Sequence, residues 1–559
     1  MSDSVYTNSK ALIRYLLRES DVLRSPVLIF VVIASASRTA MIFLINEIAG
    51  QGGPDLWSFL ALLAVSITML ATTHWSKMSG VVLVQRLIRK MRGDLTGRLL
   101  HADVTFFQER THGEMFNATT GHVSNVASTT LRLVDIVQAF LLLVFCLIYM
   151  AIQMPSSVLA TLAALVFGTI AFFATEGPAT RAVQKSHDAL VAFHDSVHDL
   201  LRGYKELRLR RTRREDLSKK IDGQVELAQS LMITTERHYS YGQIGASASL
   251  AALLASIVVV LPLIGEIDSV TMLQILTLAL FSFGPIESMV GGLPALARAA
   301  ISFQIIQELE ADLDQNAEHP ALATDSDNRP SFKTLEMRGI TAHLTRKVGS
   351  DSKAKDSFTL GPIDLTLYPG QSVFITGGNG MGKSTMLQLL TGLRHADSGQ
   401  LILDGEVITR ETIGAYRGVF AAVFSEFYMF RHIYGLSAEE RSRLQAHIEE
   451  LGIVEGVSIE GDEFTNLSLS TGQMRRLALS IALAEKRPIL VLDEFAADQD
   501  PARRRFFYDE LVPRLAAAGH CVVAVTHDEH CFSKADRLIR MEDGKIVSDT
   551  LNDNSAASA

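Results

Sequence analysis

Cysteine is scarce in this chain of 559 residues, which contains three, at positions 146, 521 and 531. None of them forms a CxxC pair or stands near histidine at the spacing of a metal site, which argues against a disulfide scaffold and a zinc site. An excess of basic residues is also missing, because the formal net charge is −9. A nucleic-acid surface needs concentrated positive charge, so we set nucleic acid aside as a partner.

Apolar residues are abundant, at 48% of the chain, and the mean hydropathy is +0.21. Runs of about 20 residues with few charges are long enough to cross about 30 Å of hydrocarbon as helices. The alternative, that each run is a core helix of a soluble protein, is disfavoured because the runs recur. Six crossings are predicted, near residues 26–46, 56–76, 135–154, 156–175, 242–265 and 270–290.

The distribution of lysine and arginine predicts how these crossings are oriented. Basic residues gather in two long loops, within residues 77–98 and 202–214, whereas the segments 47–55, 152–156 and 265–270 have none. Loops rich in lysine and arginine stay in the cytoplasm. We therefore expect both termini on the cytoplasmic side of a bacterial inner membrane. The basic runs are expected to be solvated faces rather than sites for acidic lipid.

One charge lies inside the first apolar run, at Arg38. Charges within a membrane are costly and tend to face a protein interior or a water-filled cavity. Arg38 could therefore line a substrate cavity and attract acidic or carbonyl-rich cargo. The alternative is an arginine near the outer end of the helix that extends to the lipid headgroups.

A change of pattern after the last crossing predicts the domain boundaries. Residues 311–331 are rich in Asp, Asn, Ala and Pro and read as a linker between a membrane domain at 1–310 and a second domain at 332–549, with a tail at 550–559. In the second domain, strand-like segments at 372–376, 489–492 and 521–525 alternate with helical ones. This alternation is typical of an α/β nucleotide-binding domain.

A phosphate-binding loop with the GxxxxGK[ST] spacing follows the first of these strands and precedes a helix. Its backbone N–H groups would surround the phosphates of a nucleoside triphosphate, and the helix start adds a positive dipole end. Lys383 is expected on the β- and γ-phosphates and Ser384 on magnesium. The predicted nucleotide-binding residues here are Gly377, Gly378, Asn379, Gly380, Met381, Gly382, Lys383, Ser384 and Thr385.

Two further motifs fit a triphosphate site. The apolar strand at 489–492 ends in Asp493, which can hold magnesium, and Glu494, which can orient or deprotonate an attacking water. Upstream, a helix start can bind an anion through Ser470 and the backbone at Gly472, although an ordinary capped helix would look the same. This segment consists of Leu469, Ser470, Thr471, Gly472 and Gln473.

Together these motifs resemble the ATP-binding cassette family, with Leu469 to Gln473 similar to its LSGGQ signature and a later Thr526-His527. Six crossings ahead of one cassette resemble the half-transporters among its exporters. The resemblance implies a homodimer in which ATP with Mg²⁺ lies between one chain's phosphate loop and the other's signature. It also implies that Glu494 is the catalytic carboxylate and that His527 contacts the γ-phosphate.

Several residues are assigned through this resemblance, some of them with departures from the family pattern. Ser425 stands where relatives have the glutamine that links magnesium to the membrane domain, so Ser425 or Glu426 would couple differently. His343 stands in place of the adenine-stacking tyrosine. Phe106 and Phe107 lie in a segment that resembles the first coupling segment of exporters.

The signature Leu-Ser-Thr-Gly-Gln, with Phe-Ala-Ala-Asp-Gln-Asp-Pro after Glu494, resembles the cyclic-peptide and peptide-siderophore exporters. That subgroup includes exporters of pyoverdine precursor, syringomycin-type lipopeptides and lasso microcins. The resemblance implies an ATPase that exports a peptide, with membrane lipid around it. An ATP-gated channel or regulator and a lipid flippase of the same architecture are the alternatives.

Overall fold

The computed structural model divides the chain into two compact units. A helical unit comprises Met1–Leu100 and Arg110–Gln315, and an α/β unit comprises His101–Glu109 and Asn316–Ala559. Each unit is described by itself below. The structure describes residues 2–19, 25–50, 55–110, 112–153, 155–264, 269–317, 332–347, 355–453 and 456–552.

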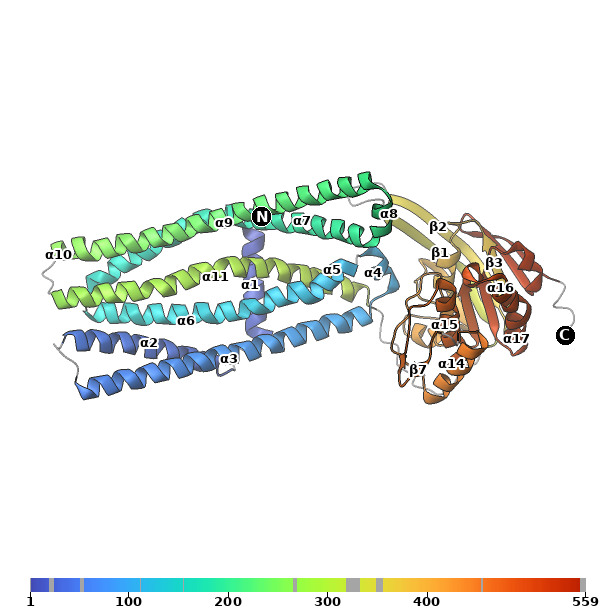
Figure 1. Ribbon diagram of the computed structural model, residues 1–559, viewed down its shortest axis with the longest axis horizontal. Helices are drawn as coiled ribbons and strands as arrows, with labels where there is room; N and C mark the ends of the chain where they lie inside the picture. The colour runs from blue at the N-terminus through green and yellow to red at the C-terminus, as the bar shows by residue number, and fades with distance from the viewer. Residues whose placement is uncertain are drawn as a thin grey trace. The chain divides into compact units, whose positions relative to one another are not determined.

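The helical unit consists of long helices joined by short segments (Figure 1). Short π-helical turns interrupt two of them, at η2 (Ala118–His122) and η3 (Ser256–Val260). The α-helices are α1 (Ser2–Glu19), α2 (Val27–Gly50), α3 (Leu56–Leu100), α5 (His112–Asn117), α6 (Val123–Gln153), α7 (Pro155–Arg202), α8 (Tyr204–Leu209), α9 (Arg211–Ala255), α10 (Leu261–Ile264) and α11 (Ser269–Gln315).

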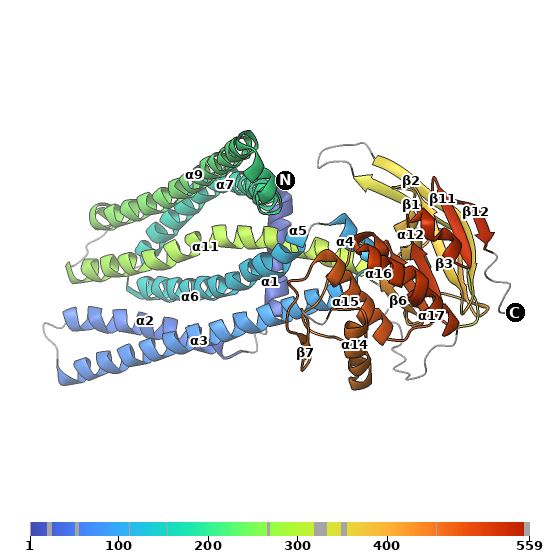
Figure 2. The ribbon, with the colours of Figure 1, turned by 45° about the vertical axis from the view of Figure 1, so that its right-hand side comes forward.

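Helices of this unit pack lengthwise in pairs, with α7 along α9, α6 along α11 and α2 along α3 (Figures 1 and 2). α3 alone has 45 residues. At about 1.5 Å per residue it is roughly 68 Å long, about twice the hydrocarbon thickness, so it continues well beyond the membrane.

Five helical stretches in the described residues are long and apolar enough to cross a membrane. These stretches, Val27–Ile48, Leu56–Leu100, Gly113–Gln153, Arg211–Val259 and Ser269–Met289, overlap the predicted crossings near 26–46, 56–76, 135–154, 242–265 and 270–290 but differ from several of them at the ends. The predicted crossing at 156–175 falls within α7, where many side chains lie outside the described residues. A multi-pass membrane unit is therefore supported, while the count of six remains a prediction.

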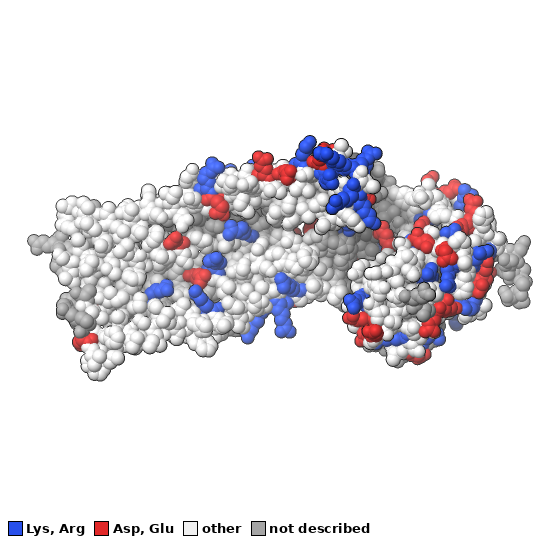
Figure 3. All heavy atoms as spheres, in the orientation of Figure 1, with Lys and Arg blue, Asp and Glu red and all other residues white. Residues whose placement is uncertain are grey.

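Charged side chains are unevenly distributed over the helical unit. Figure 3 shows a face almost free of them at the end that carries α10 and the start of α3, whereas lysine and arginine gather near α8. On α3, apolar residues such as Leu63, Ile67 and Leu70 are 47%, 58% and 64% exposed. Such surface suits contact with lipid.

The predicted linker begins too early. Helix α11 continues to Gln315, so residues 311–315 are helical. Leu313 is buried, and the acidic residues beside it form ion pairs, Asp312 with Arg110 and Asp314 with Arg98. The acidic composition that suggested a linker is thus one face of a helix paired with distant arginines. Residues 318–331 of the predicted linker lie outside the described residues.

The α/β unit contains one antiparallel sheet, one mainly parallel sheet and a small hairpin. The four-stranded sheet has the order β2-β1-β4-β5, and the six-stranded sheet has the order β12-β11-β3-β10-β9-β6. The strands are β1 (Leu335–Lys347), β2 (Lys355–Leu367), β3 (Ser372–Gly377), β4 (Ser398–Leu403), β5 (Glu406–Val407), β6 (Phe420–Val423), β7 (Ile459–Glu460), β8 (Glu463–Phe464), β9 (Ile489–Asp493), β10 (Cys521–Val525), β11 (Arg537–Glu542) and β12 (Lys545–Leu551).

Helices connect these strands and pack around the larger sheet (Figure 1). They are α12 (Lys383–Leu390), α13 (Ile413–Arg417), α14 (Ala438–Glu450), α15 (Thr471–Ala484), α16 (Pro501–Phe506) and α17 (Val512–Ala517), with short turns η4 (Phe495–Asp498), η5 (Phe507–Leu511) and η6 (Glu529–Lys534). The unit also includes α4 (Val104–Glu109), which lies between α3 and α5 in the chain and connects no strands. The predicted tail at 550–559 also begins too early, because β12 runs to Leu551 and the Asn552 amide donates to two backbone carbonyls.

The order of the parallel strands places the predicted motifs together. β3, β10, β9 and β6 pair in parallel, and all five residues of both β9 and β10 are buried. The carboxyl ends of parallel strands meet at one edge of a sheet, where ligands of such folds bind. The segments that leave β3, β6, β9 and β10 carry Gly377, Ser425, Glu494 and His527, respectively.

Candidate functional site

The loop between β3 and α12 has a backbone that requires glycine. Gly377 has φ 152° and Gly382 has φ 88°. A Cβ atom at Gly377 would lie 2.4 Å from the Met541 carbonyl oxygen, and one at Gly382 would lie 2.4 Å from a Leu360 methyl carbon. The loop thus follows a path that only glycine permits at these two positions.

Lys383 crosses this loop instead of extending into solvent. Its ammonium donates to the carbonyls of Gly377 and Gly378 at 2.9 Å each, and the residue is buried. Burial lowers the pKa of Lys383, while the negative charges of Glu494 and Asp493 act in the opposite direction. Ser384 follows it in the first turn of α12 and remains exposed.

Asp493 ends β9 and is 1% exposed. Its Oδ2 atom accepts a hydrogen bond from the Ser425 hydroxyl at 2.9 Å and a longer one from the Ser425 amide at 3.4 Å. Its Oδ1 atom is buried and has no hydrogen-bond partner among the described residues. A buried carboxylate oxygen without a partner is costly, and a bound cation would supply that partner. Mg²⁺ prefers oxygen ligands, so the Asp493 carboxylate and the Ser384 hydroxyl fit this ion.

Glu494 and His527 face each other at the same edge of the sheet. His527 Nε2 lies 3.2 Å from Glu494 Oε1, and both side chains are partly exposed. Thr526, which precedes the histidine, is buried, and its hydroxyl lies 2.5 Å from the Tyr508 hydroxyl. Tyr508 also donates to Asp528 at 3.0 Å. The histidine is therefore flanked by a fixed polar network.

The predicted signature segment forms the start of α15. Ser470 caps this helix by accepting from the Gln473 amide at 3.3 Å, and the Gln473 side chain accepts from the Ser470 amide at 2.9 Å. A Cβ atom at Gly472 would lie 2.5 Å from the Asp498 carbonyl oxygen, so this glycine allows close packing against the turn after Glu494. Leu469 packs against the core, while Ser470 and Thr471 are exposed. The segment is therefore a capped helix, and its first residues are also accessible to an anion.

His343 is not brought to the phosphate loop by any described contact. In β1 it stands opposite Thr359 of β2 and, through its ring and amide, hydrogen-bonds with Asp397. The neighbouring residue Leu344 stands opposite Phe358. A Cβ atom at Gly382 would lie 3.1 Å from the Phe358 ring, so Phe358 is the aromatic side chain against the loop. The assignment of His343 to adenine stacking therefore lacks geometric support.

The predicted coupling residues occupy two places in the α/β unit. Phe106 on α4 is buried, Phe107 is 37% exposed, and their rings meet edge to face with centroids 5.6 Å apart. Asp103, just before α4, is 3.4 Å from the ring nitrogen of His395. The Ser425 hydroxyl donates to Asp493, as described above, and Glu426 is exposed.

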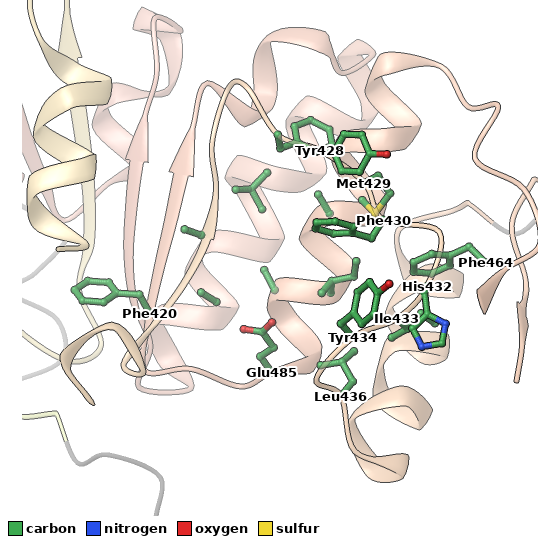
Figure 4. A pocket seen from close by; sticks show the side chains of 17 residues that line it. Phe420, Tyr428, Met429, Phe430, His432, Ile433, Tyr434, Leu436, Phe464 and Glu485 are labelled. Carbon is green, nitrogen blue, oxygen red and sulfur yellow. The ribbon is translucent and has the colours of Figure 1, made fainter. Parts of the chain in front are cut away.

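A cavity of about 280 Å³ lies beyond Glu426, against β6 and α15 (Figure 4). Its lining includes the exposed aromatic residues Tyr428, Phe430 and Tyr434, together with Glu485 at the end of α15. The rings of Phe430 and Tyr434 meet edge to face with centroids 5.6 Å apart. This cavity was not predicted from the sequence, although the density of aromatic residues at 427–434 is a signal that could have indicated it.

In the helical unit, Arg38 is partly exposed on α2. Ser35, one turn earlier, donates to the Gln138 carbonyl of α6 at 3.2 Å, so this part of α2 packs against α6. The role of Arg38 remains a prediction.

Comparison with known proteins gives matches in both units. A family model described as "ABC transporter" matches residues 360–497, and one described as "ABC transporter transmembrane region" matches residues 27–286. The chain is 30% identical over 530 residues to the ATP-binding protein SyrD of Pseudomonas syringae pv. syringae, with 92% of each chain covered. It is also 30% identical over 230 residues to the probable syringafactin export ATP-binding/permease protein SyfD of P. syringae pv. syringae (strain B728a), covering 39% of this chain and 34% of that one.

Two further matches are a lipid flippase, which is similar in sequence, and a solved exporter structure, which is similar in fold. An ATP-dependent lipid A-core flippase of Burkholderia pseudomallei (strain 1710b) is 25% identical over 495 residues, covering 83% of this chain and 78% of the flippase. A solved structure of a bacterial Atm1-family ABC exporter with ATP bound superposes with a TM-score of 0.77 at 16% identity, covering 97% of this chain and 96% of that one. At that identity the superposition supports the fold alone.

Proposed function

The chain belongs to the ABC transporter family, and from this premise we propose that it is a homodimeric exporter of a peptide across the bacterial inner membrane. As a member of this family it is a multi-pass membrane protein and an ATPase coupled to transport. The proposed cargo is a cyclic peptide, a lipopeptide or a peptide-siderophore precursor made in the cytoplasm. Both termini would then lie in the cytoplasm.

The observation that supports ATP turnover most directly is the convergence of four segments at one edge of the sheet. The loop after β3 offers backbone N–H groups and Lys383 to the phosphates, and Asp493 with Ser384 would hold Mg²⁺. Magnesium bound with ATP would offset the negative charge of the phosphate oxygens. Glu494 is then placed to orient a water molecule, and His527, 3.2 Å from it, can donate to the γ-phosphate.

A second copy of the chain would complete each ATP site. The start of α15 exposes Ser470 and Thr471. Within the part of the chain that the structure describes, no hydrogen bond joins this helix start to the loop at 377–384. A helix start attracts anions, so it is available to the γ-phosphate of a nucleotide held by a partner. This complementarity supports the proposed homodimer.

Peptide is the proposed cargo because two lines of comparison agree. The signature Leu-Ser-Thr-Gly-Gln and the segment after Glu494 resemble those of peptide exporters. SyfD, a probable syringafactin export protein, is 30% identical where it matches, and SyrD is 30% identical over nearly the whole chain. Sequence likeness in the cassette bears on energy use more than on cargo, so the membrane unit must be tested directly.

Lipid flipping is the second candidate, because a lipid A-core flippase matches 83% of the chain. The two functions share the ATP cycle and differ in what the helical unit admits. An ATP-gated channel is disfavoured, because Lys383, Asp493, Glu494 and His527 are all present and such channels often lack one of them.

Transport into inverted proteoliposomes separates these functions. We expect the purified dimer to accumulate a labelled lipopeptide inside the vesicles with ATP and Mg²⁺, and Glu494→Gln to abolish the accumulation. Movement of a fluorescent lipid without peptide uptake would favour the flippase. A passive, ATP-gated flux that persists in Glu494→Gln would favour the channel.

A further inference from the structure

Helix α15 carries a buried arginine on its apolar face. Arg475 is 9% exposed and lies one and two turns before Leu479 and Leu483, which are both buried. A guanidinium group in such a place is costly unless it is paired and hydrogen-bonded. Its partners therefore indicate why the position holds an arginine.

Both partners of Arg475 belong to the turn that follows β9. One guanidinium nitrogen, Nη1, donates to the backbone carbonyl of Glu494. Another, Nε, lies 3.0 Å from Oδ2 of Asp498 in an ion pair, without the alignment of a hydrogen bond. These two residues are the N-cap and the last residue of the turn η4, so the guanidinium group spans the turn from end to end.

Glu494 has a backbone conformation that needs such support. Its φ is 52° and its ψ is 34°, in the left-handed region that residues with a Cβ atom rarely adopt. Its amide donates to the Val525 carbonyl at the end of β10, at 3.1 Å. The amide is thus held by β10 and the carbonyl by Arg475, and these two bonds fix the direction in which the carboxylate leaves the backbone.

We propose that Arg475 is a positioning residue that holds Glu494 in its left-handed conformation and so aims its carboxylate at the attacking water. The proposal rests on the role of Glu494 in the proposed function. The adjacent Arg476 does not duplicate this action, because its guanidinium donates to the Gln499 side chain at 2.9 Å. Arg475 connects the signature helix to the catalytic carboxylate within one chain.

The test is steady-state ATP hydrolysis by the reconstituted full-length protein. Arg475→Gln removes the charge and the bond to the Glu494 carbonyl, so we expect kcat to fall by about 10- to 100-fold, as for other supporting residues, with the KM for ATP within about twofold. Arg475→Lys can reach one of the two partners at a time, so its kcat should lie between those of the wild type and Arg475→Gln.

A double variant distinguishes positioning from general damage. In a Glu494→Gln background the carboxylate is already absent, so adding Arg475→Gln should change single-turnover hydrolysis by less than about twofold. Arg443 provides a matched control, because it donates to the Ala484 carbonyl at the other end of α15 at 3.0 Å. We expect Arg443→Gln to leave kcat within about twofold of the wild type.

An equal fold-loss of the single-turnover rate from Arg475→Gln in both backgrounds would overturn the proposal, as would a raised KM at unchanged kcat in the single variant. If Arg475→Gln fails to give folded protein, Arg475→Lys decides, and an unchanged kcat there also overturns it. A Glu494→Gln variant that keeps its activity would instead refute the role of Glu494 in the proposed function, which the single variant measures separately.

Discussion

The two units use polar side chains in opposite ways. In the α/β unit, the buried residues Asp493 and Arg475 bond to other segments, Lys383 bonds across its own loop, and all three lie near one edge of a sheet. In the helical unit, many hydroxyls bond within their own helix, as Ser66 does to Leu62 and Thr72 to Thr68, both at 2.7 Å. The first arrangement specifies a reaction, whereas the second lets a helix tolerate lipid.

The largest effect should come from Lys383→Ala. This change removes the ammonium group that the loop holds for the β- and γ-phosphates, so we expect ATP hydrolysis to fall by about 100-fold or more, with a loss of ATP binding. Hydrolysis and fluorescent-nucleotide binding by the reconstituted protein measure both. Lys545→Ala, at an exposed position on β12, is the control. ATP hydrolysis retained in Lys383→Ala would contradict the assignment of this buried ammonium group to the phosphates.

A smaller effect is expected from Asp493→Asn. The amide lacks the negative charge that the unpartnered Oδ1 offers a cation, so the Mg²⁺ concentration for half-maximal hydrolysis should rise by about tenfold. Titration of Mg²⁺ at saturating ATP measures this. Ser425→Ala keeps the carboxylate and loses only its orienting bond, so its shift should be smaller. A larger shift in Ser425→Ala than in Asp493→Asn would contradict the assignment.

The motifs of the α/β unit could be placed from the sequence because each is local. A strand, a glycine-rich loop and a helix start identify the loop at 377–384, and a strand that ends in two carboxylates identifies Asp493 and Glu494. The stacking residue could not be placed in this way. His343 and Phe358 lie on different strands, and only the pairing of β1 with β2 brings Phe358, and not His343, beside Gly382.

What the sequence could not indicate depends on contacts between distant segments. Asp312 and Asp314 suggested a linker, but both belong to a helix. Asp312 pairs with Arg110 and Asp314 with Arg98, and each arginine lies more than 200 residues earlier in the chain. In the sequence, Arg475 lies in an ordinary helical run, 19 residues before Glu494, and only the fold brings the two residues together. A charge at a core position of α15 was the available signal, because burial of an unpaired arginine is improbable.

Arg38→Ala tests whether a charged side chain of the helical unit also takes part in function, as those of the α/β unit are proposed to do. If Arg38 attracts acidic or carbonyl-rich cargo, the stimulation of hydrolysis by peptide should fall by about fivefold, equivalent to about 1 kcal/mol, while basal hydrolysis stays unchanged. Arg38→Lys retains the charge and is the matched control. Equal stimulation in all three proteins would indicate that Arg38 only extends to the lipid headgroups.

The smallest effect concerns Glu485, a carboxyl group of the α/β unit with no part in hydrolysis. It lines the aromatic cavity, and its burial raises its pKa, with Arg487 acting to lower it and Glu440 to raise it. The folded state thus favours the protonated acid. Ionising this carboxyl group costs more in the folded state than in the unfolded state, so Glu485→Gln should raise the melting temperature at pH 7.5 by about 2 °C.

The pH dependence gives this prediction its sign. A carboxyl group with a raised folded-state pKa binds more protons when folded than when unfolded, so its contribution to stability is present below the unfolded-state pKa and is lost as the pH rises through the folded-state value. The advantage of Glu485→Gln should therefore shrink between pH 7.5 and pH 5. Glu449→Gln, at an exposed site on α14, should show no such trend. A constant or growing advantage at pH 5 would show that packing of the amide in the cavity, and not removal of the buried charge, stabilises the variant.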